Sequence, residues 1–551
     1  MDEASLDPLL TEDLDAARDA AEAAGAKRAA TIRALAAAGL IVTGASLASR
    51  ILGFVRYVVI ARAVPDVASL DSFLAAFRIP DFLFQLVAAG ALASALVPVI
   101  AALFATDEEA HAWRVISTVT TLILGLVVVL ALAVIVLAPV LVPFIVPGFD
   151  PARMEETIRL TRIMVLSPLF MAGGAIASAA LNAKGRFAAA SLAPLVYNVA
   201  IILGAVFLVP VLGVPGLAVG VVLGSIGHLA IQVPGLLASG GRIRPLLDLR
   251  DAATRRALLL MGPRAVGLGA TQIVFVVMTG LASPLAVGSI AAFNYAQALL
   301  QIPIGVIGVP LGTVLLPSLS RAVALGGTAA FHRLVVRGRG MLAWVMIAIA
   351  ALGFVVAPDV VRVLYRFASL KPEVLDWTAQ TLAVFMLGLT AHSMIAVLAR
   401  AFYALQDTAT PVAAALLAVV VNIAVGTALV GPYGLAGLAV AIAAGAWLET
   451  VALVILLGRR MPGLGLAPVW VLMGKSAVAS IAGAAVAWLV TAGLTATWGA
   501  NAGLLLVFVR LCLASAAGGL VILGGSPALR IDEPRSIFGI VTDLVRSRRR
   551  R

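Results

Sequence analysis

Long apolar segments, separated by short polar connections, follow one another along almost the whole chain. A bilayer is crossed by an α-helix of about 17–25 mostly apolar residues, and about fourteen such segments are present. Their centres lie near Ala45, Val87, Val128, Phe170, Ile201, Leu223, Phe275, Ile304, Ile349, Val384, Val420, Ile442, Ala484 and Val507. The pattern therefore predicts an all-α polytopic membrane protein with about fourteen transmembrane helices.

Two stretches of the chain, around Leu181–Val219 and around Leu405–Val440, resemble each other. In each, a leucine lies 17 positions before an asparagine, Asn198 in the first and Asn422 in the second, and the tetrapeptide Gly-Leu-Ala-Val follows. The copies are six predicted spans apart and so keep one orientation. This predicts two lobes related by a pseudo-two-fold axis along the membrane normal, with Asn198 superposed on Asn422. Chance similarity between helices rich in Ala, Val and Gly is the alternative.

The repeat divides the chain into five predicted regions. They are a cytoplasmic tail over residues 1–31, an N-lobe of six spans over 32–240, a C-lobe of six spans over 241–460, two further spans over 461–528, and a basic tail over 529–551. The first tail is acidic and alanine-rich, without the basic start and short apolar core of a signal peptide. The second ends in RSRRRR, which favours contact with anionic lipids, a partner-binding role being the alternative.

Composition excludes a soluble protein. With 62% hydrophobic residues and a mean hydropathy of +1.10, a chain of 551 residues has too much apolar surface for one soluble core. A single cysteine, Cys512, excludes an intrachain disulfide, and the four scattered histidines have no metal-binding spacing. We therefore expect no metal and no cofactor.

The net charge of +12 is explained by membrane topology rather than by nucleic acid. Basic residues cluster in alternate connections, which under the positive-inside rule places both termini in the cytoplasm and these connections beside anionic lipids. They are Lys184, Arg186, Arg242, Arg244, Arg250, Arg255, Arg256, Arg321, Arg333, Arg337, Arg339, Arg459 and Arg460. The exceptions, on the predicted outer side, are Arg153, Arg159, Arg362, Arg366 and Lys371.

Three arginines, Arg50, Arg56 and Arg78, lie inside the first two apolar segments. An arginine at the bilayer centre costs about 2.5–3.5 kcal/mol, and the acids in these segments are Asp71 and Asp81. Asp71 and Arg78 are seven residues apart and share one helix face. The positive excess predicts a cavity for an anionic cargo. Snorkelling of each arginine to the membrane interface is the alternative.

Other polar residues leave two interpretations open. Asp81 pairs with Arg78 or lies at the interface, and Arg264 adds charge from the second lobe or belongs to the interfacial cluster nearby. Gln85 and Gln297 are isolated amides in apolar segments. Such amides usually form interhelical hydrogen bonds, and contact with the cargo is the alternative.

The motifs Ser49-Arg50-Ile-Leu-Gly-Phe-Val-Arg56 and Asp71-Ser-Phe-Leu-Ala-Ala-Phe-Arg78 resemble the MurJ (MviN) family of lipid II flippases. The resemblance continues in the family's order over about residues 40–460, through Gly90-Ala-Leu-Ala-Ser-Ala-Leu-Val-Pro, Leu181-Asn-Ala-Lys-Gly-Arg-Phe, Met261-Gly-Pro, Asn294-Tyr-Ala, the segment from Gly305 to Arg321, and the segment from Phe402 to Pro411. It implies the fold of the multidrug/oligosaccharidyl-lipid/polysaccharide exporter superfamily, with fourteen helices in two lobes around a V-shaped cavity. It also implies that Arg50 and Arg56 are the cavity arginines of the first helix, and Asp71 the acid of the second.

Some family positions differ. Gln85 replaces an arginine that many members carry before an acid-glycine pair, and Gln297-Ala298 replaces an acid-arginine pair. Arg78 or Arg264 would then supply the missing charge. The acid that is proposed to bind sodium in some members is replaced near Met278, which removes the expectation of sodium coupling.

The resemblance implies a transporter of the bacterial cytoplasmic membrane that flips lipid II, an undecaprenyl-diphosphate-linked disaccharide pentapeptide, to the outer leaflet by alternating access. No nucleotide-binding motif is present in the sequence, so an ion gradient or the membrane potential is expected to drive any uphill step. The alternatives are an exporter of another polyprenyl-linked glycan or of a drug, a polyprenol-dependent glycosyltransferase, and a structural scaffold. An exporter of cationic drugs would need an excess of acids in its cavity. A glycosyltransferase would need acidic catalytic residues in a large outer loop, and a structural scaffold would have no reason to bury charged residues.

Overall fold

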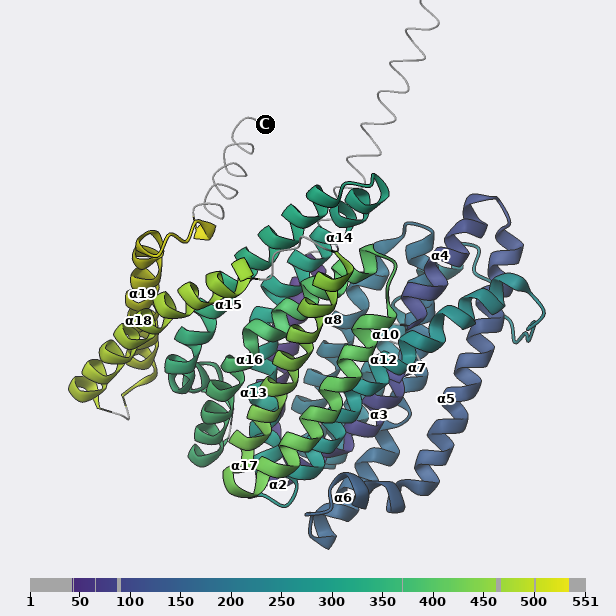
Figure 1. The fold of residues 1–551 in the computed structure, drawn as a ribbon. Helices are drawn as coiled ribbons and strands as arrows, with labels where there is room; N and C mark the ends of the chain where they lie inside the picture. Colours follow the sequence, from purple (N-terminus) through teal and green to yellow (C-terminus); the bar gives the residue numbers. More distant parts are fainter. Residues whose placement is uncertain are drawn as a thin grey trace, which may run out of the picture.

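The computed structural model describes residues 42, 44–64, 66–86, 91–368, 370–461, 467–499 and 502–534, in which all regular structure is helical (Figure 1). Eleven of these helices are long and apolar enough to cross a membrane, and two shorter apolar helices are Leu96–Ala105 and Thr271–Ala282. The all-α polytopic fold is confirmed, and the count of fourteen spans stays a prediction. The predicted tail over 1–31, and the other tail from residue 535 on, lie outside the described residues.

The N-lobe comprises the helices drawn from purple to blue in Figure 1. They are the helix Gly44–Ala63, α2 (Val67–Ala76), α3 (Arg78–Phe84), α4 (Ala91–Ala105), α5 (Glu109–Ile145), α6 (Pro151–Met164), α7 (Ser167–Ala183), α8 (Phe187–Leu203), the π-helix η2 (Gly204–Leu208), α9 (Val209–Leu212), α10 (Val214–Ala230) and α11 (Val233–Leu237). They form one bundle.

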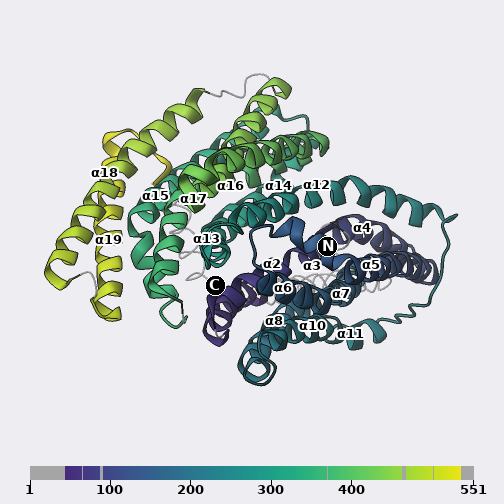
Figure 2. The ribbon, with the colours of Figure 1, turned by 90° about the horizontal axis from the view of Figure 1, so that it is seen from below.

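The C-lobe lies beside this bundle, as Figure 2 shows from below. Its helices are α12 (Ala252–Ala282), α13 (Ser289–Pro303), the π-helix η3 (Ile304–Gly308), α14 (Val309–Ala324), α15 (Thr328–Leu364), α16 (Pro372–Ala404) and α17 (Ala409–Arg460). The last two helices, α18 (Ala467–Trp498) and α19 (Leu504–Ala528), pack against α15 on the side away from the N-lobe.

The single helix α17 contains two spans. Its 52 residues would extend about 78 Å as a straight helix, more than twice the thickness of a bilayer core. The backbone leaves the helical region at Gly434 (φ 54°, ψ −132°). The two halves fold back on each other, because a Cβ atom at Gly445 would lie 2.1 Å from Oδ1 of Asn422.

The two lobes repeat one backbone plan at a nearly constant spacing. α5 and α15 each have 37 residues. Landmarks that lie 221 positions apart are the first residues of α6 and α16 (Pro151 and Pro372), two turn residues with positive φ (Gly185 and Gln406), two hairpin residues with positive φ (Gly213 and Gly434), and two glycines that approach a leucine carbonyl (Gly216 at Leu208 and Gly437 at Leu429). These shared turns support the predicted parallel repeat.

The same landmarks correct the predicted register. At a spacing of 221, Asn198 corresponds to Val419 and not to Asn422, so the predicted superposition is wrong by three residues. Three residues are close to one helical turn, which keeps the two asparagines on nearly the same face. Both are buried, with 6% and 9% exposure. Aligning the two asparagines in the sequence therefore gave a register that differs from the structural one by about one helical turn.

The lobes are in close contact at the lower end in Figure 1, where α5 joins α6 and α12 joins α13. The backbone N–H of Gly148 donates a hydrogen bond to Oγ of Ser283 at 3.0 Å. A Cβ atom at Gly148 would lie 2.3 Å from Pro284, so the N-lobe chain passes directly over the C-lobe chain. We call this the closed end.

A buried ion pair attaches α19 to the C-lobe. Nε of Arg510 donates to Oδ2 of Asp359 in α15 at 2.8 Å, and Nη2 donates to the other carboxylate oxygen. Nη1 donates to Oγ1 of Thr495 in α18 at 2.8 Å. Both charged side chains are only 3% exposed, so the guanidinium's fork geometry matches the carboxylate inside the helix bundle.

Candidate substrate-binding site

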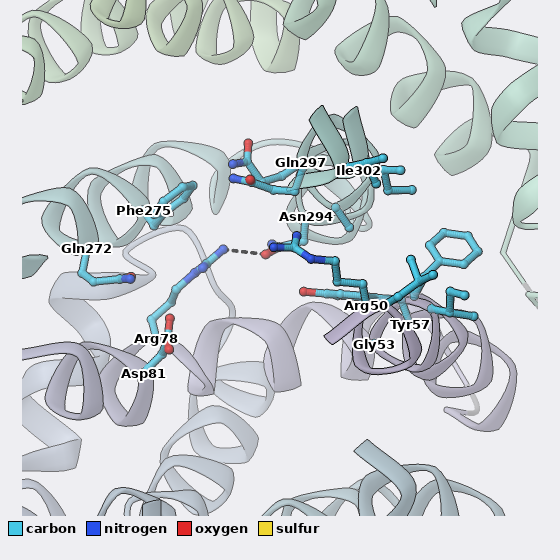
Figure 3. A pocket seen from close by; sticks show the side chains of 16 residues that line it. Arg50, Gly53, Tyr57, Arg78, Asp81, Gln272, Phe275, Asn294, Gln297 and Ile302 are labelled. Atoms are coloured by element: carbon cyan, nitrogen blue, oxygen red, sulfur yellow. Dashed lines mark hydrogen bonds between the residues drawn. The ribbon is translucent and has the colours of Figure 1, made fainter. Parts of the chain in front are cut away.

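A cavity of about 470 Å³ lies between the two lobes (Figure 3). The helix Gly44–Ala63 and α3 form its N-lobe wall, and α12 and α13 with η3 form its C-lobe wall. Its polar lining includes Arg50, Arg78, Asp81, Gln272, Asn294 and Gln297. The charged residues come from the N-lobe and the uncharged amides from the C-lobe.

Arg78 crosses from one wall to the other. Its Nε donates to Oγ1 of Thr279 in α12 at 2.8 Å, and Nη2 donates to Oδ1 of Asn294 in α13 at 2.6 Å. The guanidinium also lies 5.7 Å from the ring of Phe275. Asn294 holds its orientation because its Nδ2 donates to the carbonyl of Ile290. The arginine is therefore bound by the C-lobe through two neutral acceptors.

Arg50 also reaches the C-lobe, at a place where the backbone has no side chain. A Cβ atom at Gly305 would lie only 1.9 Å from Nη1 of Arg50. Gly305 belongs to η3, and a π-helical turn widens the backbone at functional sites in many proteins. The glycine thus provides the space in which the guanidinium lies. Gly53 lines the cavity one turn further along the helix of Arg50.

Arg56 lies in a second compartment of about 210 Å³. This compartment shares Tyr57, Arg78, Asp81 and Asn294 with the larger cavity. The guanidinium of Arg56 is 5.3 Å from the ring of Tyr57 and 6.0 Å from that of Tyr197, distances typical of cation–π contact. All three predicted arginines therefore border these two adjacent cavities.

The two acids have different positions from those expected. Asp81 lines both compartments. Among the ion pairs of the described residues, none joins its carboxylate to the guanidinium of Arg78 within 4.0 Å. Asp71 lines neither compartment and is 1% exposed. The expectation that Asp71 borders the cavity is wrong, although it does share with Arg78 the face that contacts α13.

Asp71 instead holds the lobes together at the closed end. Its carboxylate accepts hydrogen bonds from the backbone N–H groups of Gly288 at 2.7 Å and Ala291 at 2.8 Å, at the beginning of α13. A carboxylate at a helix N-terminus satisfies free N–H groups and matches the helix dipole. Nη2 of Arg153 adds a hydrogen bond at 3.3 Å. This contact accounts for one of the arginines that the charge pattern left unexplained.

Of the remaining predicted residues, Gln297 lies in the cavity and Gln85 does not. Gln297 lines the cavity, and its buried Oε1 has no hydrogen-bond partner. Gln85 follows α3 and lines neither compartment. Arg264 lies in α12, and its side chain is outside the described part of the structure. Thr279 was not predicted from the sequence, because a lone threonine in an apolar helix has no distinguishing signal.

The position of Met278 offers no ligand for sodium. Met278 is fully buried, and its thioether side chain packs against Gly426 of α17. Hard cations require oxygen ligands, and a thioether and a glycine Cα supply none. No group of three or more His, Cys, Asp and Glu residues with metal-binding geometry occurs among the described residues.

Two lobes of membrane-length helices around a cationic, lobe-bridging cavity define a multi-pass membrane transporter. The family model described as lipid II flippase MurJ matches residues 60–509. The chain belongs to the lipid II flippase MurJ family, which makes it a transporter and not an enzyme.

Relatives and solved structures agree with this assignment. The lipid II flippase MurJ of Burkholderia cenocepacia is 32% identical over 434 residues, which are 77% of this chain and 84% of the relative. The probable lipid II flippase MurJ of Vibrio cholerae is 33% identical over 424 residues, 75% of this chain and 80% of the relative. A solved structure described as lipid II flippase MurJ in an inward closed conformation has a TM-score of 0.73 at 21% identity, covering 89% of this chain and 99% of the other. An inward-facing multidrug resistance MATE family transporter of the MOP superfamily has a TM-score of 0.63 at 16% identity, covering 75% of this chain and 95% of the other, which shows a shared fold.

Proposed function

We propose that this protein moves lipid II from the inner to the outer leaflet of the bacterial cytoplasmic membrane. The observation that supports this most directly is the charge of the cavity. Arg50, Arg56 and Arg78 line two adjacent cavities with Asp81 as the acid among the lining residues, which leaves two positive charges in excess. A diphosphate carries the complementary negative charge, and arginine binds phosphate oxygens with two parallel hydrogen bonds.

The contacts across the cavity suggest how binding and movement are linked. Arg78 is held by Thr279 and Asn294, and Arg50 lies on Gly305, so both arginines connect the lobes before cargo arrives. A diphosphate offers charged acceptors, which form stronger hydrogen bonds than the neutral amide and hydroxyl. Cargo binding therefore exchanges contacts between the lobes for contacts with the cargo. Rocking of the lobes then moves the head group while the lipid tail stays in the bilayer.

The closed end is the outer side in this proposal, and both termini are cytoplasmic. Basic connections at the opposite end then lie beside the anionic lipids of the inner leaflet. A membrane potential that is negative inside favours outward movement of an anionic head group by about 2.3 kcal/mol per charge per 100 mV. The potential is thus a sufficient driving force without a sodium site.

A leaflet-resolved assay of lipid II tests the proposal. Depletion of the protein should leave lipid II inaccessible from outside, and expression of the wild-type chain should restore access. An exporter of another polyprenyl-linked glycan shares the diphosphate, so the same cells should be assayed for such glycans. Normal lipid II distribution after depletion, with another glycan retained inside, would refute the proposed cargo.

A further inference from the structure

A second cavity lies at the closed end of the C-lobe, away from the interface between the lobes. Its volume is about 530 Å³, close to that of the central cavity and within the usual range for ligand pockets. The last residues of α15, the start of α16 and the start of α19 surround it. We call it the lower cavity.

The lower cavity contains basic residues that the positive-inside pattern does not explain. Arg362 lies in the last turn of α15 and Arg366 in the turn that follows this helix, and both line the cavity. Asp376 is the acid among the lining residues, and it lies 3.8 Å from Nη2 of Arg362 with 57% of its side chain exposed. Lys371, in the adjoining connection, adds a further positive charge.

The opposite wall also favours an anion and is fixed in position. Gly503, Leu504 and Val507 line it at the beginning of α19. The first N–H groups of a helix lack intrahelical partners and form the positive end of its dipole. One turn further on, Arg510 binds Asp359, one turn before Arg362 in α15. The buried ion pair therefore sets the distance between the two walls.

The lower cavity is separated from the central cavity by an aromatic contact. Tyr365 lines the lower cavity, and its hydroxyl donates to the carbonyl of Tyr295 at 3.1 Å. The Tyr365 ring is 5.6 Å from that of Phe54, which lines the central cavity. The rings of Tyr365 and Phe54 therefore lie between the two cavities.

The basic pair is absent from the equivalent place in the N-lobe. α5 and α15 have equal length and begin 219 positions apart, so Arg362 corresponds to Pro143, and the connection 146–150 that follows α5 contains no basic residue. The shared backbone plan of the lobes therefore does not require these arginines. They are a property of the C-lobe alone.

We propose that the lower cavity binds the phosphate groups of a lipid in the outer leaflet, and that this lipid is the cargo after its diphosphate has crossed the membrane. The identification of the cargo rests on the proposed function, whereas phosphate binding does not. On this proposal, Arg50 and Arg78 hold the diphosphate before the lobes rock, and Arg362 and Arg366 hold it afterwards. The second site thereby prevents return to the central cavity.

Binding of farnesyl diphosphate to the purified full-length chain in nanodiscs tests the site. In an Arg50→Ala background, which weakens the central site, Arg366→Ala should reduce the remaining affinity at least tenfold, since hydrogen bonds to charged groups contribute about 1.5–3 kcal/mol. Arg366→Lys should lose less. Arg159→Ala is the matched control, because Arg159 is also exposed and on the predicted outer side but does not line the cavity. Equal affinity of the Arg50→Ala chain with and without Arg366→Ala would overturn the site.

Competition identifies the source of the phosphate. Dioleoyl phosphatidylglycerol should displace farnesyl diphosphate only at much higher concentration, and farnesol should not displace it. Equal competition by phosphatidylglycerol would overturn the assignment to the cargo and indicate a phospholipid head group. These binding measurements do not depend on transport, so a failed lipid II assay and a failed lower-cavity assay are distinguishable.

Discussion

The N-lobe and the C-lobe share a backbone plan but differ in the chemistry of the walls that they present to the central cavity. Turns and close contacts recur 221 positions apart, including the approach of Gly216 to Leu208 and of Gly437 to Leu429. The N-lobe wall carries arginines and Asp81, whereas the C-lobe wall carries amides, a hydroxyl and a glycine. The fold thus depends on apolar spacing and small residues, and the cargo preference on a few charges in one lobe.

The largest effect on transport is expected from removing charge on the N-lobe wall. Arg50→Ala or Arg56→Ala should abolish complementation of a flippase-depleted cell while membrane insertion stays intact, because each loses a charge that attracts the diphosphate. Arg50→Lys should restore it only in part, since lysine lacks the planar fork. Arg337→Ala, an exposed arginine away from the cavity, is the control. Full activity of both alanine variants would show that the charged wall is not the substrate site.

The shared backbone plan predicts that equivalent Gly→Ala substitutions in the two lobes cause a similar loss of stability. A methyl group at Gly216 would lie 2.5 Å from the Leu208 carbonyl oxygen, and one at Gly437 would lie 2.3 Å from that of Leu429. Each Gly→Ala variant should therefore lose about 1–3 kcal/mol of stability, seen as a lower thermal unfolding temperature in detergent. Gly431→Ala, where no atom lies within 4 Å, should be unaffected. Damage in one lobe only would contradict the repeat.

An intermediate effect is expected at the point where the C-lobe makes room for an N-lobe arginine. Gly305→Ala places a methyl group where Nη1 of Arg50 lies, and the flexible side chain must move. Complementation should fall between that of wild type and of Arg50→Ala, with unchanged thermal stability. Gly125→Ala, at an exposed helix position with nothing within 4 Å, provides the comparison. Wild-type activity of Gly305→Ala would mean that the position of Arg50 is not critical.

The smallest effect is expected from the amides of the C-lobe wall. Gln297→Ala should reduce transport only slightly, because an interhelical hydrogen bond contributes about 0.6 kcal/mol on average and Oε1 of Gln297 has no partner. Asn294→Ala should cost more, since Asn294 accepts a hydrogen bond from Arg78. The two variants should be compared in one titration of expression level. A loss for Gln297→Ala as large as for Arg50→Ala would place binding energy on the C-lobe wall.

The sequence predicted the membrane fold and the cavity arginines because both follow from the free energy of transferring side chains between water and the bilayer. Apolar runs of membrane length have few alternatives to a spanning helix, and an arginine inside such a run must face protein or water. Arg50 and Arg78 were therefore identifiable without coordinates. Their exact partners were not, because Thr279 and Gly305 have no charge that marks them as partners.

The acids show where such reasoning fails. Asp71 and Asp81 both lie near Arg78 in sequence, and helix periodicity placed Asp71 on the correct face. Periodicity does not show which other helix lies against that face. In the structure it is the beginning of α13, whose first N–H groups donate to the Asp71 carboxylate. The pairing of Asp359 with Arg510 was also missed, because 151 residues separate the partners.

That pairing has a consequence for how the chain is assembled in the membrane. Arg510 alone inside a bilayer costs about 2.5–3.5 kcal/mol, and Asp359, synthesised much earlier, waits without its counter-charge until α19 arrives. We therefore expect α18 and α19 to enter the bilayer as a hairpin alongside α15 rather than independently in lipid. A chain that ends before α19 therefore leaves the carboxylate of Asp359 without the guanidinium that neutralises it in the folded protein.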